Sequence, residues 1–148
     1  MKRCFALVIA GFLLLPLAAA GQDAPEPPFA PIAADGVDLT QFLWNNRIVA
    51  VFADSAADPA FVAQMQFLAR EAGELTARDI IVITDTAPAA ATPLRQKLRP
   101  RGFSLVWIDK DGAVRLRKPN PWTVRELTHA IDKTPLRMQE IQERQVGG

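Results

Sequence analysis

The stretch from Asn46 to Met65 constrains the fold more than any other part of the chain. It opens with a short apolar run, Arg47 to Ala53, whose length and flanking turn residues predict a buried strand. After a small polar turn, Asp58 and Pro59 combine an N-cap residue with a proline at the first helical position, which predicts the start of a helix. A strand that passes through a tight turn into a helix indicates an α/β domain.

The elements that follow extend this pattern. Residues 79–84 are apolar enough to form a strand that is covered on both faces. Strand, helix and second strand then imply a right-handed parallel crossover. A short helix is predicted to begin at Thr92-Pro93. Residues 103–108 and 113–117 flank an Asp-Gly pair, which predicts an antiparallel hairpin.

Two further cap-and-proline pairs, Asn120-Pro121 and Thr134-Pro135, predict the last two helices, the second of which runs over about residues 135–145. This last helix is mostly polar, and the sequence leaves open whether it packs on the sheet edge or offers a surface to a partner. Taken together, the elements predict an α/β fold with a central mixed four-stranded sheet, in the order β-α-β-α-β-β-α, and helices on both faces.

The first twenty residues have the pattern of a secretory signal peptide. Lys2 and Arg3 precede an apolar core at residues 5–17, and Ala18-Ala19-Ala20 is a small-residue cleavage site. We expect cleavage after Ala20 rather than an uncleaved anchor, because the apolar run is shorter than a spanning helix needs. The prediction is a periplasmic or secreted protein with no transmembrane segment after cleavage, a proline-rich linker at residues 21–36 and one domain at residues 37–148.

Cysteine usage limits the chemistry that the exported chain can perform. Cys4 is the only cysteine, and it leaves with the predicted signal peptide. The mature chain then has no disulfide, no thiol nucleophile and no cysteine metal ligand. Its single histidine, His129, has no second histidine to form a metal-binding pair, and neither calcium-loop spacing nor a glycine-rich phosphate loop is present, so we expect no metal and no cofactor.

Charge is distributed unevenly along the chain. Residues 21–94 carry 3 basic and 10 acidic side chains, whereas residues 95–118 carry 8 basic and only 2 acidic ones. Such a basic segment favours an anionic partner, for example lipopolysaccharide, a cell-wall polymer, an acidic lipid or an acidic protein patch. The alternative is that charges on an edge strand prevent aggregation. A nucleic acid is not expected outside the cytoplasm. The predicted surface comprises Arg95, Lys97, Arg99, Arg101, Lys110, Arg115, Arg117 and Lys118.

Several local strings, in the same order, resemble the DUF4174 family. They are residues 38–44 (DLTQFLW), 47–53 (RIVAVFA), 102–105 (GFSL) with 109–112 (DKDG), and 135–140 (PLRMQE). The resemblance covers roughly residues 38–142 and implies a thioredoxin-like fold of uncertain function. The family occurs in secreted bacterial proteins and in animal extracellular-matrix proteins, and fold-level analogy alone transfers no role to this chain.

The sequence departs twice from redox-active thioredoxins. At the position of their Cys-x-x-Cys motif it has Asp54-Ser55-Ala56-Ala57, and Phe103 or Ser104 replaces the cis-proline that faces their active site. Disulfide exchange and thiol peroxidase chemistry are therefore excluded for the predicted mature chain.

The turn that replaces the thiol motif contains weak candidates for a catalytic or binding site, namely Asp54, Ser55 and Asp58. A carboxylate or hydroxyl there has the chemistry of a ligand-binding group or of an acid or base, and Arg101 is a further candidate at the same mouth. The competing interpretation is ordinary turn and capping chemistry. A nucleophilic Ser55 also needs a base, and His129 is predicted to lie exposed on a helix surface.

We therefore expect an exported, non-catalytic binding or envelope-associated module. The alternative is an enzyme of unrecognised type that uses the Asp54–Asp58 turn. The oligomeric state stays open.

Overall fold

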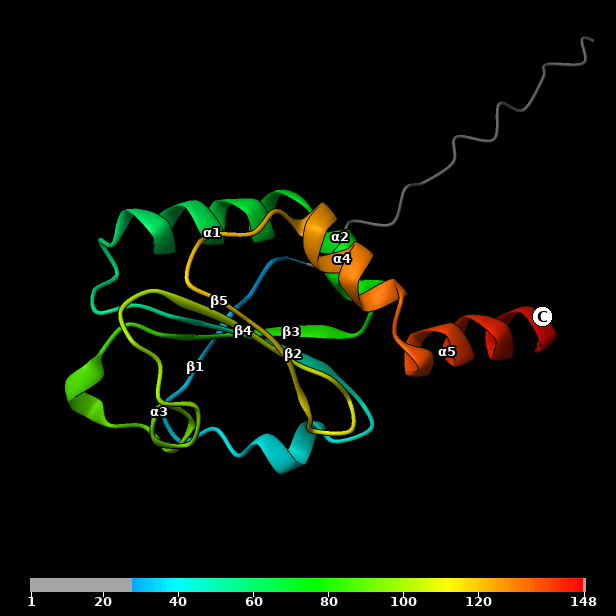
Figure 1. The fold of residues 1–148 in the computed structure, drawn as a ribbon, viewed down its shortest axis with the longest axis horizontal. Coiled ribbons are helices and arrows are strands. Elements are labelled where there is room, and N and C mark those ends of the chain that lie inside the picture. Colours follow the sequence, from blue (N-terminus) through cyan, green and yellow to red (C-terminus); the bar gives the residue numbers. More distant parts are fainter. Residues whose placement is uncertain (1–27, 148) are drawn as a thin grey trace, which may run out of the picture.

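The computed structural model describes residues 28–147, which form a mixed five-stranded sheet with helices on both faces (Figure 1). The predicted signal peptide and the first part of the predicted linker lie outside these residues. The strand order is β1-β3-β2-β4-β5. The strands are β1 (Ile32–Ala33), β2 (Arg47–Phe52), β3 (Ile80–Asp85), β4 (Ser104–Ile108) and β5 (Val114–Lys118).

The central strand, β2, pairs in parallel with β3 and antiparallel with β4, and β5 completes the predicted hairpin with β4. All six residues of β2 are buried, as the apolar run predicted. The predicted mixed α/β sheet is therefore confirmed, with one strand more than expected.

The additional strand, β1, comes from residues that the sequence placed in the linker. It pairs in parallel with β3, and the backbone N–H of Ala34 donates to the carbonyl of Thr84 at 2.9 Å. Two residues are too few to show any periodic pattern, so only the pairing with β3 defines this strand. The folded domain thus extends further toward the N-terminus than residue 37.

Three helices cover one face of the sheet. They are α1 (Pro59–Arg70), α2 (Ala72–Thr76) and α4 (Val124–Asp132), and they pack their apolar side chains against Val49 and Val51 of β2. The opposite face is covered by the six-residue helix α3 (Pro93–Leu98) and the four-residue 3₁₀ helix η1 (Leu39–Phe42). The two layers lie above and below the sheet in Figure 1.

Helix α4 begins later than its predicted start at Asn120-Pro121, so that prediction is wrong. Thr123 is the N-cap, and it forms a reciprocal capping box with Glu126. The backbone of Trp122 cannot join the helix because the Gln64 side chain holds it from both sides. Its N–H donates to Gln64 Oε1 at 2.8 Å, and its carbonyl accepts from Gln64 Nε2 at 2.9 Å.

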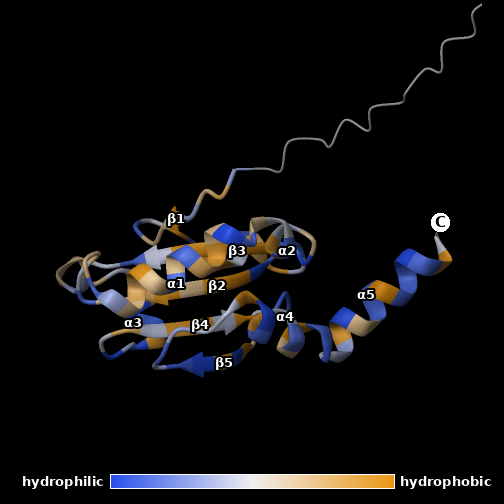
Figure 2. Ribbon diagram, turned by 90° about the horizontal axis from the view of Figure 1, so that it is seen from above, coloured by the Kyte–Doolittle hydropathy of each residue, from blue (hydrophilic) through white to orange (hydrophobic). Residues whose placement is uncertain are grey.

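The last helix, α5 (Pro135–Val146), projects away from the sheet (Figures 1 and 2). Figure 2 shows apolar residues concentrated in the central strands and a mostly hydrophilic α5 and β5. A short 3₁₀ helix, η2 (Pro88–Ala90), follows β3. Within residues 28–147, no helix combines the length and the apolar character that a membrane crossing requires.

Candidate functional site

The strand register gathers the predicted mouth residues at one edge of the sheet. Phe52, the last residue of β2, pairs with Asp85, the last residue of β3, and with Ser104, the first residue of β4. The turn at residues 54–58 and the segment at residues 99–103 therefore emerge side by side. In α/β sheets this carboxyl edge of the parallel strands is where ligands commonly bind.

The side chains of the turn at residues 54–58 form local hydrogen bonds that shape the turn and cap α1. Asp58 caps α1, because its Oδ1 accepts hydrogen bonds from the backbone N–H of Ala60 at 2.8 Å and of Phe61 at 3.3 Å. The Ser55 hydroxyl accepts from the N–H of Ala57 at 3.1 Å, and the Ser55 carbonyl accepts from the N–H of Asp58. Asp54 and Ser55 are exposed. The contacts of Ser55 and Asp58 match the turn-and-cap interpretation. The side chain of Asp54 forms no hydrogen bond or ion pair in the described domain.

Behind this turn lies an ion pair that the sequence did not predict. Asp85 is buried at the end of β3, and its Oδ1 accepts from Arg95 at 2.8 and 3.1 Å. Its Oδ2 accepts from the hydroxyl of Thr92 at 2.7 Å. Arg95 also donates to the carbonyls of Ala53 and Asp85 at 3.0 Å, and its guanidinium lies 5.5 Å from the ring centroid of Phe52. The guanidinium therefore bridges the ends of β2 and β3.

Asp85 stays charged in this environment. Burial by itself raises the pKa of this carboxyl, but the hydrogen bonds from Arg95 and Thr92 outweigh burial and hold the pKa below its ordinary value. A carboxylate with a lowered pKa and both oxygens occupied is a poor general base. The sequence assigned Arg95 to the anionic-partner surface, but its guanidinium points inward to Asp85. Arg95 is therefore not part of that surface.

The other predicted features of the mouth do not assemble a catalytic group. Phe103 is buried, Ser104 opens β4, and none of the peptide bonds among the described residues is cis. His129 is exposed in the last turn of α4. That helix starts near the mouth, after β5, and ends at Asp132, which contacts Arg78 just before β3 begins. His129 therefore lies toward the opposite edge of the sheet from Ser55.

Most of the remaining predicted basic residues have partners inside the domain. Arg115 pairs with Asp111, and Lys110 pairs with Asp79 at 2.8 Å. Arg117 donates to the carbonyl of Leu98 at 2.6 Å, and the Lys118 amine lies 4.3 Å from the ring centroid of Trp122. β5 is an edge strand of the sheet, and its cations contact neighbouring groups of the domain.

Three predicted cations, Lys97, Arg99 and Arg101, are exposed and form no ion pair, side-chain hydrogen bond or cation–π contact among residues 28–147. The exposed Arg117 also lacks an ion pair, but it donates to the carbonyl of Leu98. We call Lys97, Arg99 and Arg101 the α3 basic surface. Lys97 lies on α3, and Arg99 caps the helix in a left-handed conformation with φ of 48°. Arg101 follows in the segment that leads into β4, beside the Asp54–Asp58 turn.

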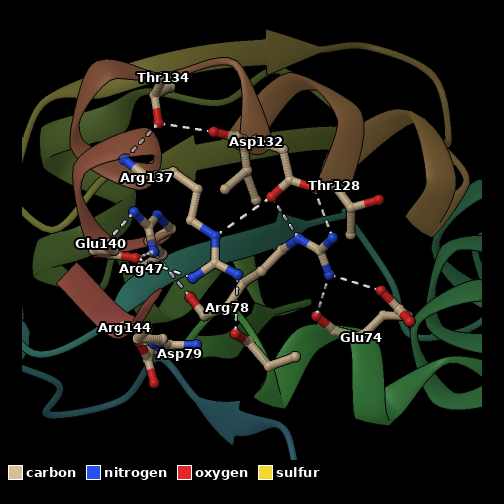
Figure 3. Close-up of polar contacts among 12 residues, drawn as sticks. Arg47, Glu74, Arg78, Asp79, Thr128, Asp132, Thr134, Arg137, Glu140 and Arg144 are labelled. Carbon is tan, nitrogen blue, oxygen red and sulfur yellow. Dashed lines mark hydrogen bonds and ion pairs between the residues drawn. The ribbon is translucent and has the colours of Figure 1, made fainter. Parts of the chain in front are cut away.

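A larger set of charges lies at the other end of the strands, where β2 and β3 begin, and it joins α5 to the domain (Figure 3). Arg47, fully buried at the start of β2, donates to both carboxylate oxygens of Glu140 on α5, at 3.2 and 3.0 Å. Its Nε lies 2.9 Å from Oδ1 of the buried Asp109, without the alignment of a hydrogen bond. Glu140 also pairs with Lys110 at 3.0 Å and with Arg137 at 3.1 Å.

These contacts fix the charge of Glu140. Burial alone raises the pKa of this carboxyl, but the hydrogen bonds from Arg47, Lys110 and Arg137 lower the pKa from 4.5 to about 2. The same end of the strands holds Arg78, which donates to Asp132 at 2.9 and 2.7 Å and to Glu74 at 2.7 Å. Each carboxylate is matched by a guanidinium or amine, so this network attaches α5 and leaves little unpaired charge for a ligand. These ion pairs attach α5 to the domain, while the helix itself projects away from the sheet (Figure 1).

Among residues 28–147, no three histidine, cysteine, aspartate or glutamate side chains are grouped so as to hold a metal ion.

Comparison with known structures places the fold. Chloroplastic thioredoxin z is similar with a TM-score of 0.54 and 18% identity, over 70% of this chain and 92% of the thioredoxin. The reduced 2-Cys peroxiredoxin of Plasmodium vivax gives a TM-score of 0.54 and 16% identity, over 72% of this chain and 85% of that one. The exposed lipoprotein thioredoxin of Streptococcus pneumoniae gives a TM-score of 0.50 and 14% identity, over 70% of this chain and 97% of that one. At such identities the likeness shows a thioredoxin-like fold alone.

No curated protein matches the sequence significantly. The model of a protein family described as a domain of unknown function, DUF4174, matches residues 38–140. This match includes η1 at one end and Glu140 of the α5 network at the other. The chain therefore belongs to the DUF4174 family.

Proposed function

We propose that this protein is an exported, non-catalytic binding module that uses the α3 basic surface to hold an anionic partner at the cell envelope. The observation that carries the proposal is the exposure of Lys97, Arg99 and Arg101 within five consecutive residues, with no ion pair to any of them inside the described domain. Exposed cations that are not neutralised internally attract anionic ligands and speed their association.

The location of these cations supports the proposal further. They lie at the end of α3 and in the segment before β4, beside the carboxyl ends of the parallel strands, where α/β sheets commonly bind ligands. Cations at a helix C-terminus also interact favourably with the helix dipole, which accounts for a part of their placement. That effect falls off within the last turn, so it does not account for Arg101, which lies beyond the helix.

The enzyme alternative has weaker support. Asp58 and Ser55 are engaged in the cap and turn, Asp85 is neutralised by Arg95, and His129 lies toward the opposite edge. The Ser55 hydroxyl, the candidate nucleophile, contacts the backbone N–H of Ala57 and not a base.

The test compares two triple variants with the same change of charge. The first is Lys97→Glu/Arg99→Glu/Arg101→Glu, and the control is Arg70→Glu/Arg125→Glu/Lys133→Glu, three exposed cations elsewhere on the domain. Retention on a dextran sulfate column is measured as the salt concentration at elution. We expect the first variant to elute at clearly lower salt than the control, because the binding surface and not the net charge determines retention.

Equal elution of the two variants would overturn the proposal. Far-UV circular dichroism and urea unfolding of both variants check that the fold is intact. Capture of partners from a periplasmic extract, at low and high salt, then identifies what the surface binds in the cell.

A further inference from the structure

The two faces of the sheet are covered unequally. One face lies under helices of twelve, five and nine residues, whereas the other lies under α3 with six residues and η1 with four. The second face nevertheless carries an apolar cluster that includes Ile48, Phe52 and Ile83. Two short helices do not close over such a surface completely, and hollows remain between them.

The larger hollow lies between η1 and α3 and has a volume of about 390 Å³. This volume falls within the range of roughly 300 to 1,000 Å³ that small-molecule sites occupy. Its wall is mainly apolar, from Val37, Leu39, Pro93 and Leu94. A smaller hollow of about 70 Å³ shares Leu39, Thr40 and Lys97 with it and reaches the core residues Ile48 and Ile108. We call the two hollows together the η1–α3 cleft.

The charged groups of the cleft are few and differ in availability. Asp38 lines the larger hollow, but its two carboxylate oxygens accept from the backbone N–H and the hydroxyl of Thr40, at 2.9 and 2.6 Å. Asp109 and Lys110 line the smaller hollow, where Asp109 lies beside Arg47 and Lys110 pairs with Asp79 and Glu140. Lys97 lines both hollows and forms no ion pair in the described domain, although the hydrogen bonds from Thr40 and, to a lesser extent, the charge of Lys97 lower the pKa of Asp38. The cleft therefore combines an apolar wall with one available cation at its rim.

We infer that the η1–α3 cleft binds a single-chain anionic amphiphile, a fatty carboxylate, with the acyl chain against Val37, Leu39, Pro93 and Leu94 and the carboxylate at Lys97. The inference rests on the proposed function only in that Lys97 belongs to the α3 basic surface. It adds the chemical class of the ligand: one apolar chain and one negative head group. Asp109 opposes a head group in the smaller hollow, so the carboxylate lies at the solvent side, by Lys97.

The first test is a chain-length series on the wild-type protein, expressed from the full-length chain and purified as the host processes it. Octanoate, decanoate and dodecanoate are titrated by calorimetry below their micelle concentrations. Each methylene that enters the cleft is expected to tighten binding about fourfold, from the transfer free energy of a buried methylene. Affinity that does not change with chain length, or no binding at all, overturns the inference.

The second test uses point variants. Lys97→Met is expected to weaken dodecanoate binding about tenfold, because a charge-assisted hydrogen bond is lost. The control, Lys133→Met, removes an exposed lysine on the other side of the domain and should leave the affinity unchanged. Val37→Phe fills the cleft without changing charge, and it is expected to abolish the dependence on chain length.

These variants separate the two proposals. Val37→Phe should keep the dextran sulfate retention of the wild type, since the α3 basic surface is intact. If dextran sulfate retention depends on Lys97 while no carboxylate binds, the cleft inference is wrong and the proposed function stands. If retention is independent of the α3 basic surface but dodecanoate binds with the predicted dependence, the proposed function fails and the cleft remains. Binding to phosphatidylglycerol vesicles without binding of monomeric dodecanoate also overturns the inference, in favour of a membrane surface.

Discussion

Glu140 and Arg47 form a two-point contact between α5 and the start of β2, with N–O distances of 3.2 and 3.0 Å. The two residues are 93 positions apart, and Arg47 is fully buried. Buried ion pairs are weak net contributors to stability, but removal of one partner leaves the other charge uncompensated. Glu140 is therefore the residue on which the attachment of α5 depends.

The first prediction concerns removal of this carboxylate. Glu140→Gln is expected to lower the free energy of unfolding by about 3 kcal/mol, because Arg47 keeps only the poorly aligned Asp109 as an anionic neighbour. Urea unfolding at neutral pH measures the change. The control Glu143→Gln alters an exposed carboxylate one turn away and should change stability by no more than about 0.5 kcal/mol. Equal effects of the two substitutions would contradict the assigned role of Glu140.

The second prediction is a pH dependence with a defined sign. Glu140 has its pKa lowered from 4.5 to about 2, so between these values the unfolded chain binds more protons than the folded one. Stability from this group is complete above pH 4.5 and is lost as the pH falls toward 2, by about 3 kcal/mol in total. Asp132, whose pKa is lowered by its hydrogen bonds with Arg78, loses stability in the same direction.

The measurement is the difference in unfolding free energy between wild type and Glu140→Gln as a function of pH. We expect the difference to shrink steadily from pH 4.5 to pH 2. A difference that stays constant across this window would show that Glu140 titrates normally in the folded protein.

The third prediction concerns the buried ion pair of Arg95 and Asp85, at the carboxyl end of β3. Arg95→Met removes the guanidinium from Asp85 and from two backbone carbonyls, and it is expected to cost about 3 kcal/mol of stability. Arg99→Met, a change of an exposed residue on the same segment, should cost far less. Asp85→Asn in the Arg95→Met background should recover part of the loss, because the uncompensated charge is then absent. The absence of any recovery would mean that packing, and not charge, explains the effect.

The fourth prediction separates capping from catalysis in the Asp54–Asp58 turn. Asp58→Ala is expected to cost about 1 kcal/mol, through the loss of the hydrogen bonds to the first turn of α1. Asp54→Ala should leave stability unchanged, because that side chain is exposed. The readout beyond stability is retention on dextran sulfate, which neither substitution should reduce. Loss of a cellular phenotype in Asp54→Ala or Ser55→Ala, with stability retained, would instead favour the enzyme alternative.

The sequence predicted those elements whose signals are local. The apolar run of β2, the Asp-Gly turn of the hairpin and the caps Asp58, Thr92 and Thr134 are all found in the structure. The start of α4 was predicted wrongly, because the Asn120-Pro121 signal competes with the capping box at Thr123. The side chain of Gln64, far away in sequence, decides between these two starts.

The polar part of the site was predicted less well, for a reason of distance along the chain. A run of basic residues shows how many cations are present but not which carboxylates they meet. Arg95 meets Asp85 ten residues earlier, and Arg47 meets Glu140 almost a hundred residues later. Contacts that the sequence does not reveal, with carboxylates, a carbonyl and an aromatic ring, therefore leave only the three cations of the α3 basic surface without a side-chain contact in the described domain. A polar residue inside an apolar strand, such as Arg47 at the start of β2, was the one available signal of a buried pair.

The attachment of α5 by charges also determines how the domain opens. A helix that contacts the body mainly through ion pairs can separate without exposing the apolar cores on either face of the sheet. Amide hydrogens of α5 should thus exchange through a local opening, well before those of β2, β3 and β4. Because the cost of desolvating charges falls on heating, the ion pairs that attach α5 weaken less with temperature than an apolar contact of equal strength. We therefore expect α5 and the sheet to unfold as two cooperative units within one small domain.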